Sequence, residues 1–203
     1  MSAASSGGAT AKGLRRRNEL LDTAERLLAA SGGAQFTLRA VAHEAGVRLG
    51  HLQHYFPTRA DLLAALLDRA LTTSLARIAD RTGPSDDGTD PATVISSVLA
   101  DHDDLPLVRL FTEVWAMAAH DDDTAAVRSF YAQYAGHVAA VIRHHVPELD
   151  ETEARARAEV FVMTVEGASL FRSGITGGRT PQTDAVLRDT LLDLLTRPRR
   201  TLR

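Results

Sequence analysis

Apolar residues recur at three- and four-residue intervals through most of this chain. From about residue 14, leucine and alanine occupy one helical face, while arginine and glutamate occupy the opposite face. This stripe consists of Leu14, Leu20, Leu21, Ala24, Leu27 and Leu28. The glycine pair Gly32–Gly33 follows it, so we predict a first helix of about five turns that ends there.

Two short helices joined by a tight turn are predicted within residues 36–63. Thr37 is a good N-cap for a helix from Leu38 to Ala45. Gly46 follows, and glycine tolerates the left-handed backbone that a sharp reversal between helices requires. The second short helix is expected from about Arg48 to Tyr55.

The next helix has a recognisable start. Thr58 and Asp61 resemble a capping box, although glutamate is the usual partner at the second position. A wide apolar stripe that includes Leu62 and Leu71 follows. It predicts one long helix from Arg59 to about Arg81.

The remaining sequence predicts five further helices and no strand. Residues 82–91, with the sequence TGPSDDGTDP, form the clearest loop in the chain. The helices beyond it are expected at residues 92–100, 107–119, 124–145, 150–173 and 183–196. The predicted fold is therefore all-α, with about nine helices.

These helices suggest three segments. Residues 1–12 are small and polar without a periodic apolar face, so we expect a disordered arm. Residues 13–58 are expected to form a domain of three helices with a helix-turn-helix arrangement. Residues 59–203 are expected to form a larger helical domain.

Composition excludes several chemistries. The chain of 203 residues has no cysteine, which rules out disulfides, thiolate nucleophiles and cysteine-based zinc sites. No run approaches the roughly 20 apolar residues that cross a bilayer, and the first residues lack a signal-peptide core, so we expect a cytoplasmic protein. Residues 1–60 carry eight Lys/Arg against four Asp/Glu, a charge of +4, while residues 61–203 carry fifteen against twenty-two, a charge of −7. The asymmetry favours an anionic partner for the first part, unless it reflects chance in a short segment.

The second short helix carries side chains suited to DNA. Such a helix fits the major groove while the preceding helix crosses the backbone and points its amino end at a phosphate, which Thr37 could bond. Arg48 can reach a phosphate or a guanine edge, and His51 and Gln53 can bond base edges or phosphates. Gly50 allows the helix to approach closely.

This stretch resembles the TetR (tetracycline-repressor) family of bacterial transcriptional regulators. The matching residues are Phe36-Thr37, Val41-Ala42, Ala45-Gly46-Val47, Gly50, His54-Tyr55-Phe56 and Arg59-Ala60-Asp61-Leu62-Leu63. The resemblance implies phosphate contacts from Thr37, Tyr55, Thr58 and Arg59, and a place in or beside the groove for Arg48, Leu49, Gly50, His51 and His54. Our predicted DNA-binding set also includes Arg39 and Gln53. Surface or core positions without DNA contact are the alternatives for His54 and Tyr55.

Two positions depart from the family pattern. Arg48 stands where the family usually has a Ser or Thr cap, and because arginine cannot cap a helix we expect it to contact DNA directly. Gln53 stands where an aromatic residue is common, so the operator preference of relatives cannot be transferred. Leu49, which is often polar in relatives, either touches a thymine methyl group or packs against the protein.

The resemblance to the TetR family implies that residues 13–58 bind DNA and that the larger domain, residues 59–203, dimerises and holds a small molecule, the effector. Aromatic pockets between helices are a common form of such sites. The candidate lining residues are Phe111, Trp115, Met117, Phe130, Tyr131, Tyr134, Phe161 and Met163. An ordinary place in the core is the alternative for each of them.

The segment from Leu110 to Ser173 is similar to the carboxy-terminal domain of the betaine-regulator branch of the same family, notably at FTEVWAMAAHDD and VEGASLFRSG. The similarity implies a homodimer built on the last two helices, which would form a four-helix bundle. The expected interface residues are Ala158, Phe161, Val162, Val165, Ser169, Leu187, Leu191, Leu194 and Leu195.

Metal binding and enzymatic activity are not expected. Residues 101–104, 120–123 and 144–145 contain ligand-type side chains, but aspartates at helix ends commonly act as caps. No zincin motif, phosphate loop or hydrolase elbow occurs, and we expect no cofactor.

The sequence therefore predicts a DNA-binding transcriptional regulator. The leading hypothesis is a homodimeric repressor that leaves a near-palindromic, double-stranded operator when an unidentified small-molecule effector binds. No membrane partner is expected. The alternatives are a DNA-binding regulator without an effector and a helical adaptor that does not bind DNA.

Overall fold

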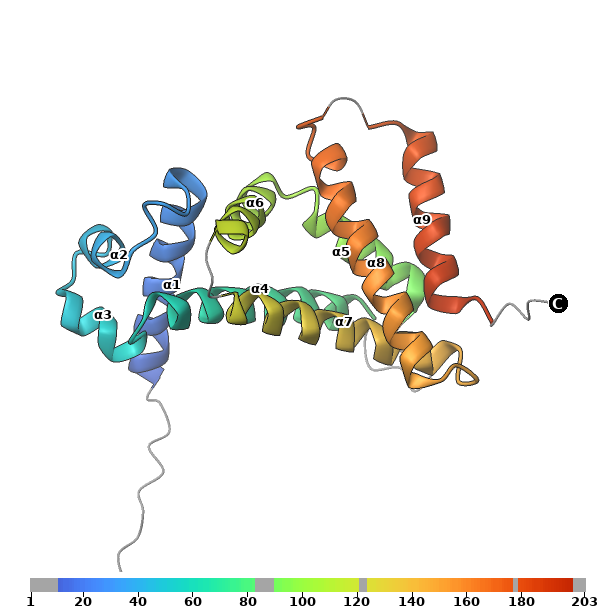
Figure 1. Cartoon of the computed structure of the whole chain (residues 1–203), viewed down its shortest axis with the longest axis horizontal. Coiled ribbons are helices and arrows are strands. Elements are labelled where there is room, and N and C mark those ends of the chain that lie inside the picture. Colours follow the sequence, from blue (N-terminus) through green and yellow to red (C-terminus); the bar gives the residue numbers. More distant parts are fainter. Residues whose placement is uncertain (1–10, 83–89, 121–123, 177–178, 199–203) are drawn as a thin grey trace, which may run out of the picture. The chain divides into compact units, whose positions relative to one another are not determined.

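The computed structural model describes residues 11–82, 90–120, 124–176 and 179–198, which contain nine α-helices and no strand (Figure 1). The helices are α1 (Ala11–Ser31), α2 (Leu38–Glu44), α3 (Leu49–Tyr55), α4 (Arg59–Thr82), α5 (Pro91–Asp101), α6 (Leu105–His120), α7 (Ala125–His145), α8 (Glu151–Arg172) and α9 (Pro181–Thr196). The all-α prediction is confirmed. Within this part of the chain, no helix is long and apolar enough to cross a membrane.

Some predictions fall on segments that the structure does not describe. The proposed arm lies almost wholly in residues 1–10, and most of the 82–91 loop and of the 120–123 break are likewise outside the described residues. Ala11 and Lys12 are expected in the arm from the sequence, but they begin α1.

The chain divides into two compact units, Met1–Leu66 and Leu67–Arg203. The division lies within α4, whereas the sequence predicts a boundary between residues 58 and 59. Leu62, Leu63 and Leu66 on the first turns of α4 are all buried. The smaller unit therefore includes the start of α4 as well as α1, α2 and α3.

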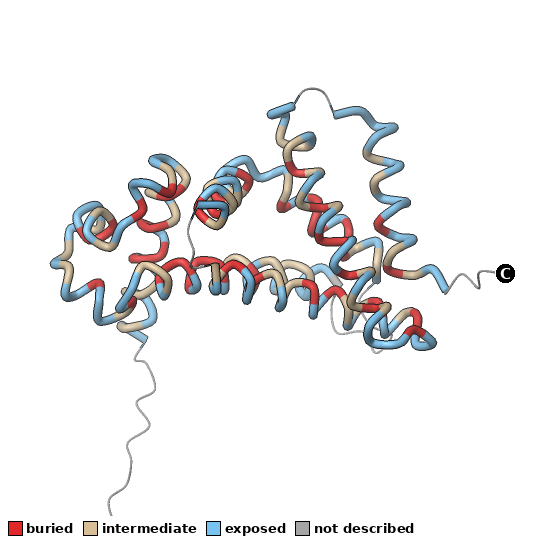
Figure 2. The backbone as a smooth tube through the Cα atoms, viewed as in Figure 1, coloured by how far each residue is buried: buried red, intermediate tan, exposed pale blue. Residues whose placement is uncertain are grey.

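The larger unit has a core contributed by α5, α7, α8 and α9. Its fully buried side chains include Ile142, Phe161 and Leu191, and α8 packs against both α7 and α9. Figure 2 shows the resulting pattern, in which buried and exposed positions alternate along each helix. Burial of large apolar side chains on this scale is the main stabilising contribution to such a core.

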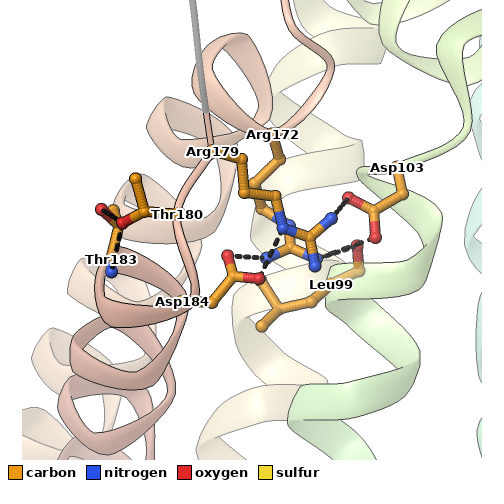
Figure 3. Close-up of polar contacts among 7 residues, drawn as sticks. All are labelled: Leu99, Asp103, Arg172, Arg179, Thr180, Thr183 and Asp184. Carbon is orange, nitrogen blue, oxygen red and sulfur yellow. Dashed lines mark hydrogen bonds and ion pairs between the residues drawn. The ribbon is translucent and has the colours of Figure 1, made fainter.

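Four charged residues tie the start of α9 to the end of α5 (Figure 3). The side chain of Arg172 is only 4% exposed and donates to Asp103 at 2.8 Å and to Asp184 at 2.7 Å. Arg179 binds the same two carboxylates. The network fixes the Asp103 turn, which directly follows α5, against the α8–α9 pair.

The expected dimer contacts require a correction. Seven of the nine predicted residues, Ala158, Phe161, Val162, Val165, Ser169, Leu191 and Leu195, are buried within the single chain. The other two, Leu187 and Leu194, are partly buried against the same core. Their apolar stripe packs inward because α7, α8 and α9 of one chain already cover it, so it is not free to contact a second copy.

Candidate DNA-binding surface and effector cavity

The turn between α2 and α3 is fixed by backbone hydrogen bonds. Gly46 has φ of 64°, and its N–H donates to the carbonyl of His43 at 3.1 Å. The N–H of Val47 reaches back to the carbonyl of Ala42 at 2.9 Å. Together these bonds form a Schellman motif, which satisfies the last carbonyls of α2 and sets the direction in which α3 leaves.

The predicted caps are confirmed. Thr37 Oγ1 accepts the N–H of Ala40 at 3.1 Å at the start of α2. Thr58 and Asp61 form a reciprocal capping box, in which Asp61 accepts the N–H and hydroxyl of Thr58 while its own N–H donates to Thr58 Oγ1 at 3.1 Å. Arg48 occupies the N-cap position of α3 without a side-chain capping bond, as expected.

The outer face of α3 presents hydrogen-bonding groups and no acid. Arg48, His51, Gln53 and His54 are exposed, and α3 contains neither Asp nor Glu. Leu52 is fully buried and anchors the helix. The structure thus exposes four hydrogen-bonding side chains around the buried Leu52 of a short, fixed helix.

Tyr55 is held between two of these side chains. Its ring meets that of His51 edge-on at 5.5 Å and that of His54 at 5.3 Å between centroids. Phe56, the next residue, is buried and lies under the guanidinium of Arg17 at 5.2 Å. Aromatic packing therefore restrains the end of α3 as well as its beginning.

Not every predicted phosphate ligand is equally available. Thr37, Arg39, Leu49 and Gly50 lie on or beside α2 and α3 with at least partial exposure, and Thr58 is exposed. Arg59 differs because its Nε donates to the Phe36 carbonyl at 2.8 Å and its Nη2 to the Gly33 carbonyl at 3.2 Å. These bonds give Arg59 a structural role, tying α4 to the loop before α2.

The larger unit contains a mostly apolar cavity between α4, α5, α6, α7 and α8. The residues that line it are Ala70, Leu71, Ser74, Val98, Asp101, His102, Leu107, Val108, Phe111, Phe130, Tyr134, Glu166 and Ser169. The volume of the empty cavity is about 50 Å³, which is room for a few water molecules.

The polar groups of this cavity come from α4, α5 with the residue that follows it, α7 and α8. Asp101 accepts from Ser74 Oγ at 2.6 Å and pairs with Arg77 at 3.0 Å. His102 Nε2 faces Glu166 at 3.7 Å, and both side chains are 14% exposed. Burial opposes the charged form of His102, but Glu166, the Val98 carbonyl and Asp101 together raise its pKa above the ordinary value.

The tyrosines nearby are held neutral. Burial raises the pKa of Tyr134 well above its ordinary value, and the carboxylates of Glu166 and Asp101 raise it further. Burial and Glu166 likewise raise the pKa of Tyr131, whose hydroxyl accepts a hydrogen bond from Trp115 Nε1 at 2.6 Å. Both phenols therefore act only as neutral hydrogen-bonding groups at physiological pH.

Comparison with known proteins identifies the smaller unit. Residues 20–66 match the model of the bacterial regulatory proteins of the tetR family. The match covers α2, the turn at Gly46 and α3, the elements whose geometry is described above. Over most of its length, the smaller unit therefore matches the DNA-binding domain of tetR-family regulators. This match indicates a DNA-binding transcriptional regulator.

The similarity extends along the chain. An HTH-type transcriptional regulator of the dhlA 5′ region of Xanthobacter autotrophicus is 26% identical over 187 residues, covering 89% of this chain and 88% of that protein. The multidrug binding protein EbrR, solved with imidazole, has a TM-score of 0.67 and 24% identity, with coverage of 91% and 97%; it was also solved with malachite green. Salmonella enterica GusR has a TM-score of 0.73 and 18% identity, with coverage of 93% and 99%. This chain shares the fold of these solved structures.

The structure separates the eight predicted effector residues. Phe111, Phe130 and Tyr134 line the cavity. Trp115, Tyr131 and Met163 line an open groove on the outside of α6, α7 and α8, where Met163 is 67% exposed. The remaining two, Met117 and Phe161, are buried and line neither space, so they belong to the ordinary core.

Sequence reasoning misses the polar half of the cavity. The sequence indicates Asp101 and His102 only as members of an acidic, metal-like cluster and Ser169 as a dimer residue, and it does not single out Glu166. Among the described residues, no group of three or more His, Cys, Asp or Glu side chains is arranged to hold a metal. The available signal was a histidine and an acid on otherwise apolar helices, but their pairing depends on the fold.

Proposed function

We propose that this protein is a homodimeric repressor that releases a near-palindromic operator when a small molecule enters the cavity of the larger unit. The observation that supports DNA recognition most directly is the acid-free exposed surface of α3, which includes Arg48, His51, Gln53 and His54. Arginine at guanine and histidine or glutamine at base edges and phosphates are suitable contacts for this face in the major groove. Thr37 and Arg39 would add contacts to the phosphate backbone.

The second copy would bind the exposed side of α8. Ala156, Val160, Met163, Gly167 and Phe171 recur at helical spacing and are all exposed, with Val160 at 46% and Phe171 at 61%. This α8 stripe is mostly apolar and lies opposite the face that packs in the core. A twofold pairing of this kind would place two α3 helices about one DNA turn, roughly 34 Å, apart.

Helix α4 would couple the cavity to DNA. Its first turns carry the buried Leu62 and Leu66, and its later turns supply Ala70, Leu71 and Ser74 to the cavity wall. A ligand that displaces this wall would shift α4 and with it the spacing of the two α3 helices. Release then follows from the different affinity of the ligand for the two arrangements.

Selection from random duplex DNA with the full-length protein tests the proposal, because such a selection requires no known operator. We expect enrichment of a near-palindrome. Replacing both Arg48 and His51 by Ala should lower affinity for that sequence about a hundredfold or more, since each contact of this kind is worth about 1–3 kcal/mol. Mass in solution should remain that of a dimer.

The matched control is the double variant Arg109→Ala, His137→Ala, which removes the same residue types from exposed positions of the larger unit. It should bind the selected DNA as the unmodified protein does. No enriched sequence, or equal loss of binding in both double variants, would overturn the assignment of α3 as the DNA-reading element.

A further inference from the structure

Glu166 is a poorly satisfied carboxylate at the wall of an apolar cavity. Its side chain is 14% exposed. Among the described residues, the carboxylate of Glu166 has one partner, His102, with 3.7 Å between His102 Nε2 and Glu166 Oε2. That separation is longer than a hydrogen bond. A carboxylate removed from water in this way is stabilised by donors, and one loose partner leaves most of its acceptor capacity unused.

The orientation of the His102 ring determines which of its nitrogens carries a proton. Its Nδ1 lies 2.8 Å from the Val98 carbonyl, and because a carbonyl can only accept, Nδ1 carries a proton. Nε2 then faces Glu166 either as an N–H donor in the imidazolium or as a bare lone pair in the neutral ring. In the empty cavity the imidazolium is favoured, since a lone pair facing a carboxylate is repulsive.

The other acid of the cavity is already occupied. Asp101 receives the Ser74 hydroxyl at 2.6 Å and the Arg77 guanidinium at 3.0 Å. An arginine cannot give up its proton at neutral pH, whereas an imidazolium can. Of the two acids, Glu166 is thus the one whose partner can be exchanged for a ligand.

The rest of the lining suits a compact apolar body. The rings of Phe111 and Phe130 lie 5.4 Å apart between centroids, and those of Phe130 and Tyr134 lie 6.1 Å apart. All three line the cavity. Aromatic faces attract cations as well as apolar groups. The Tyr134 hydroxyl makes no hydrogen bond with the described residues and so remains open to a ligand in this space.

We propose that the effector is a small primary ammonium compound with an apolar body, whose charged head takes the place of the His102 imidazolium at Glu166. An ammonium group has three N–H donors and no acceptor. Glu166, the freed Nε2 of His102 and the Tyr134 oxygen are three acceptors on the wall of one cavity. This inference rests on the proposed function, in that it names the chemical class of the molecule that the cavity would bind.

The exchange conserves charge within the cavity. The ligand brings one positive charge, and His102 loses its Nε2 proton to solvent, so Glu166 remains paired with a single cation. The charged and titratable groups that act on His102 are Glu166 on α8 and Asp101 beside it. Tyr131 and Tyr134 on α7 interact in turn with Glu166, and Arg77 on α4 pairs with Asp101. Because a proton leaves on binding, affinity for the ammonium compound should rise with pH while His102 is still protonated in the free protein.

Three probes with the same branched body and different heads provide the test. They are 3,3-dimethylbutylammonium, 3,3-dimethylbutan-1-ol and 3,3-dimethylbutanoate, which are cationic, neutral and anionic. Calorimetric titration of the full-length protein should show the ammonium binding at least about tenfold tighter than the alcohol, as a charge-assisted hydrogen bond allows. Titrations in buffers of different ionisation heat should show release of up to about one proton per ligand.

Two variants test whether Glu166 is the group that binds the ammonium. Glu166→Gln keeps the shape but removes the charge, and it should abolish the preference for the ammonium. Glu159→Gln makes the same change on the same helix at a residue that does not line the cavity, and it should retain the preference. If Glu166→Gln does not fold, the order of affinities among the three probes for the unmodified protein remains decisive.

Four results would each overturn the inference. They are equal affinity for the three probes, tighter binding of the carboxylate, absence of binding by any probe, and a Glu166→Gln variant that keeps the preference for the ammonium. None of these results would affect the selection of operator DNA, so the proposed DNA-binding function would stand. Conversely, ammonium binding with proton release in a protein that selects no DNA would support the cavity assignment and contradict the repressor proposal.

Discussion

The two units of this protein place their functional residues in opposite ways. In the smaller unit, the side chains proposed to act project outward from α3 and are set by neighbours a few residues away, such as the turn at Gly46. In the larger unit, Asp101, Tyr134 and Glu166 come from three helices and point into a shared interior space. A surface for DNA can therefore be specified by local sequence, whereas a cavity for a small molecule requires that distant segments meet.

The largest effect should come from the buried network of the larger unit. Arg172→Ala removes a guanidinium that is 4% exposed and leaves Asp184, itself 14% exposed, with less compensation. Breaking a buried ion pair from one side typically costs about 3–5 kcal/mol. Chemical unfolding followed by fluorescence of Trp115, the single tryptophan of the chain, should show a loss of that order in the larger unit.

A surface pair on the same unit is the control. Arg197 and Asp193 are both 56% exposed and 2.9 Å apart, and Arg197→Ala should change the unfolding free energy by no more than about 0.5 kcal/mol. Similar losses in the two variants would mean that the network of Figure 3 does not stabilise the start of α9 through its burial.

The features of the smaller unit were easier to predict from the sequence than those of the larger unit. The caps at Thr37 and Thr58, the turn at Gly46 and the long helix α4 were predictable because each depends on residues within a turn or two. The sequence did not predict which face of α8 packs in the core: the face expected at the dimer interface is buried within the single chain. That helix carries apolar residues on two faces, and helical spacing does not reveal which of them its own chain covers.

The cavity was predictable only in its apolar half. Phe111, Phe130 and Tyr134 could be chosen because aromatic residues line most such sites. Glu166 could not, since its significance arises from the position of His102 across the fold. A single acid on an amphipathic helix resembles any solvent-exposed residue until its neighbours in space are known.

Two glycines of the smaller unit should respond to alanine with opposite signs. Gly46 has φ of 64° with no atom within 4 Å of an added Cβ, so Gly46→Ala incurs backbone strain alone, about 1–2 kcal/mol. Gly50 lies in α3 without a positive φ and also has open space, so Gly50→Ala should stabilise the helix by up to about 0.5–1 kcal/mol.

Far-UV circular dichroism during unfolding measures both changes, while Trp115 fluorescence should be unaffected by either. DNA binding separates the roles further. Gly50→Ala should weaken binding to the selected operator despite its added stability, because the methyl group stands on the face proposed to approach the bases. Unchanged or tighter binding by this more stable variant would argue against a close approach of α3 at Gly50.

The smallest expected effect is a pH dependence of the larger unit. The pKa of His102 is raised in the folded chain, so its contribution to stability is fully present below the unfolded value of about 6.5 and is lost as pH rises through the folded pKa. The effect is small because burial opposes the charge that Glu166 favours.

The unfolding free energy, followed by Trp115 fluorescence from pH 6 to pH 9, should fall more steeply for the unmodified chain than for His102→Gln. Coinciding profiles would show that the His102–Glu166 pair does not favour the imidazolium. A steeper fall in the variant would show that the pair favours the neutral ring. In either case the larger unit would not hold the proton that ammonium binding is proposed to release.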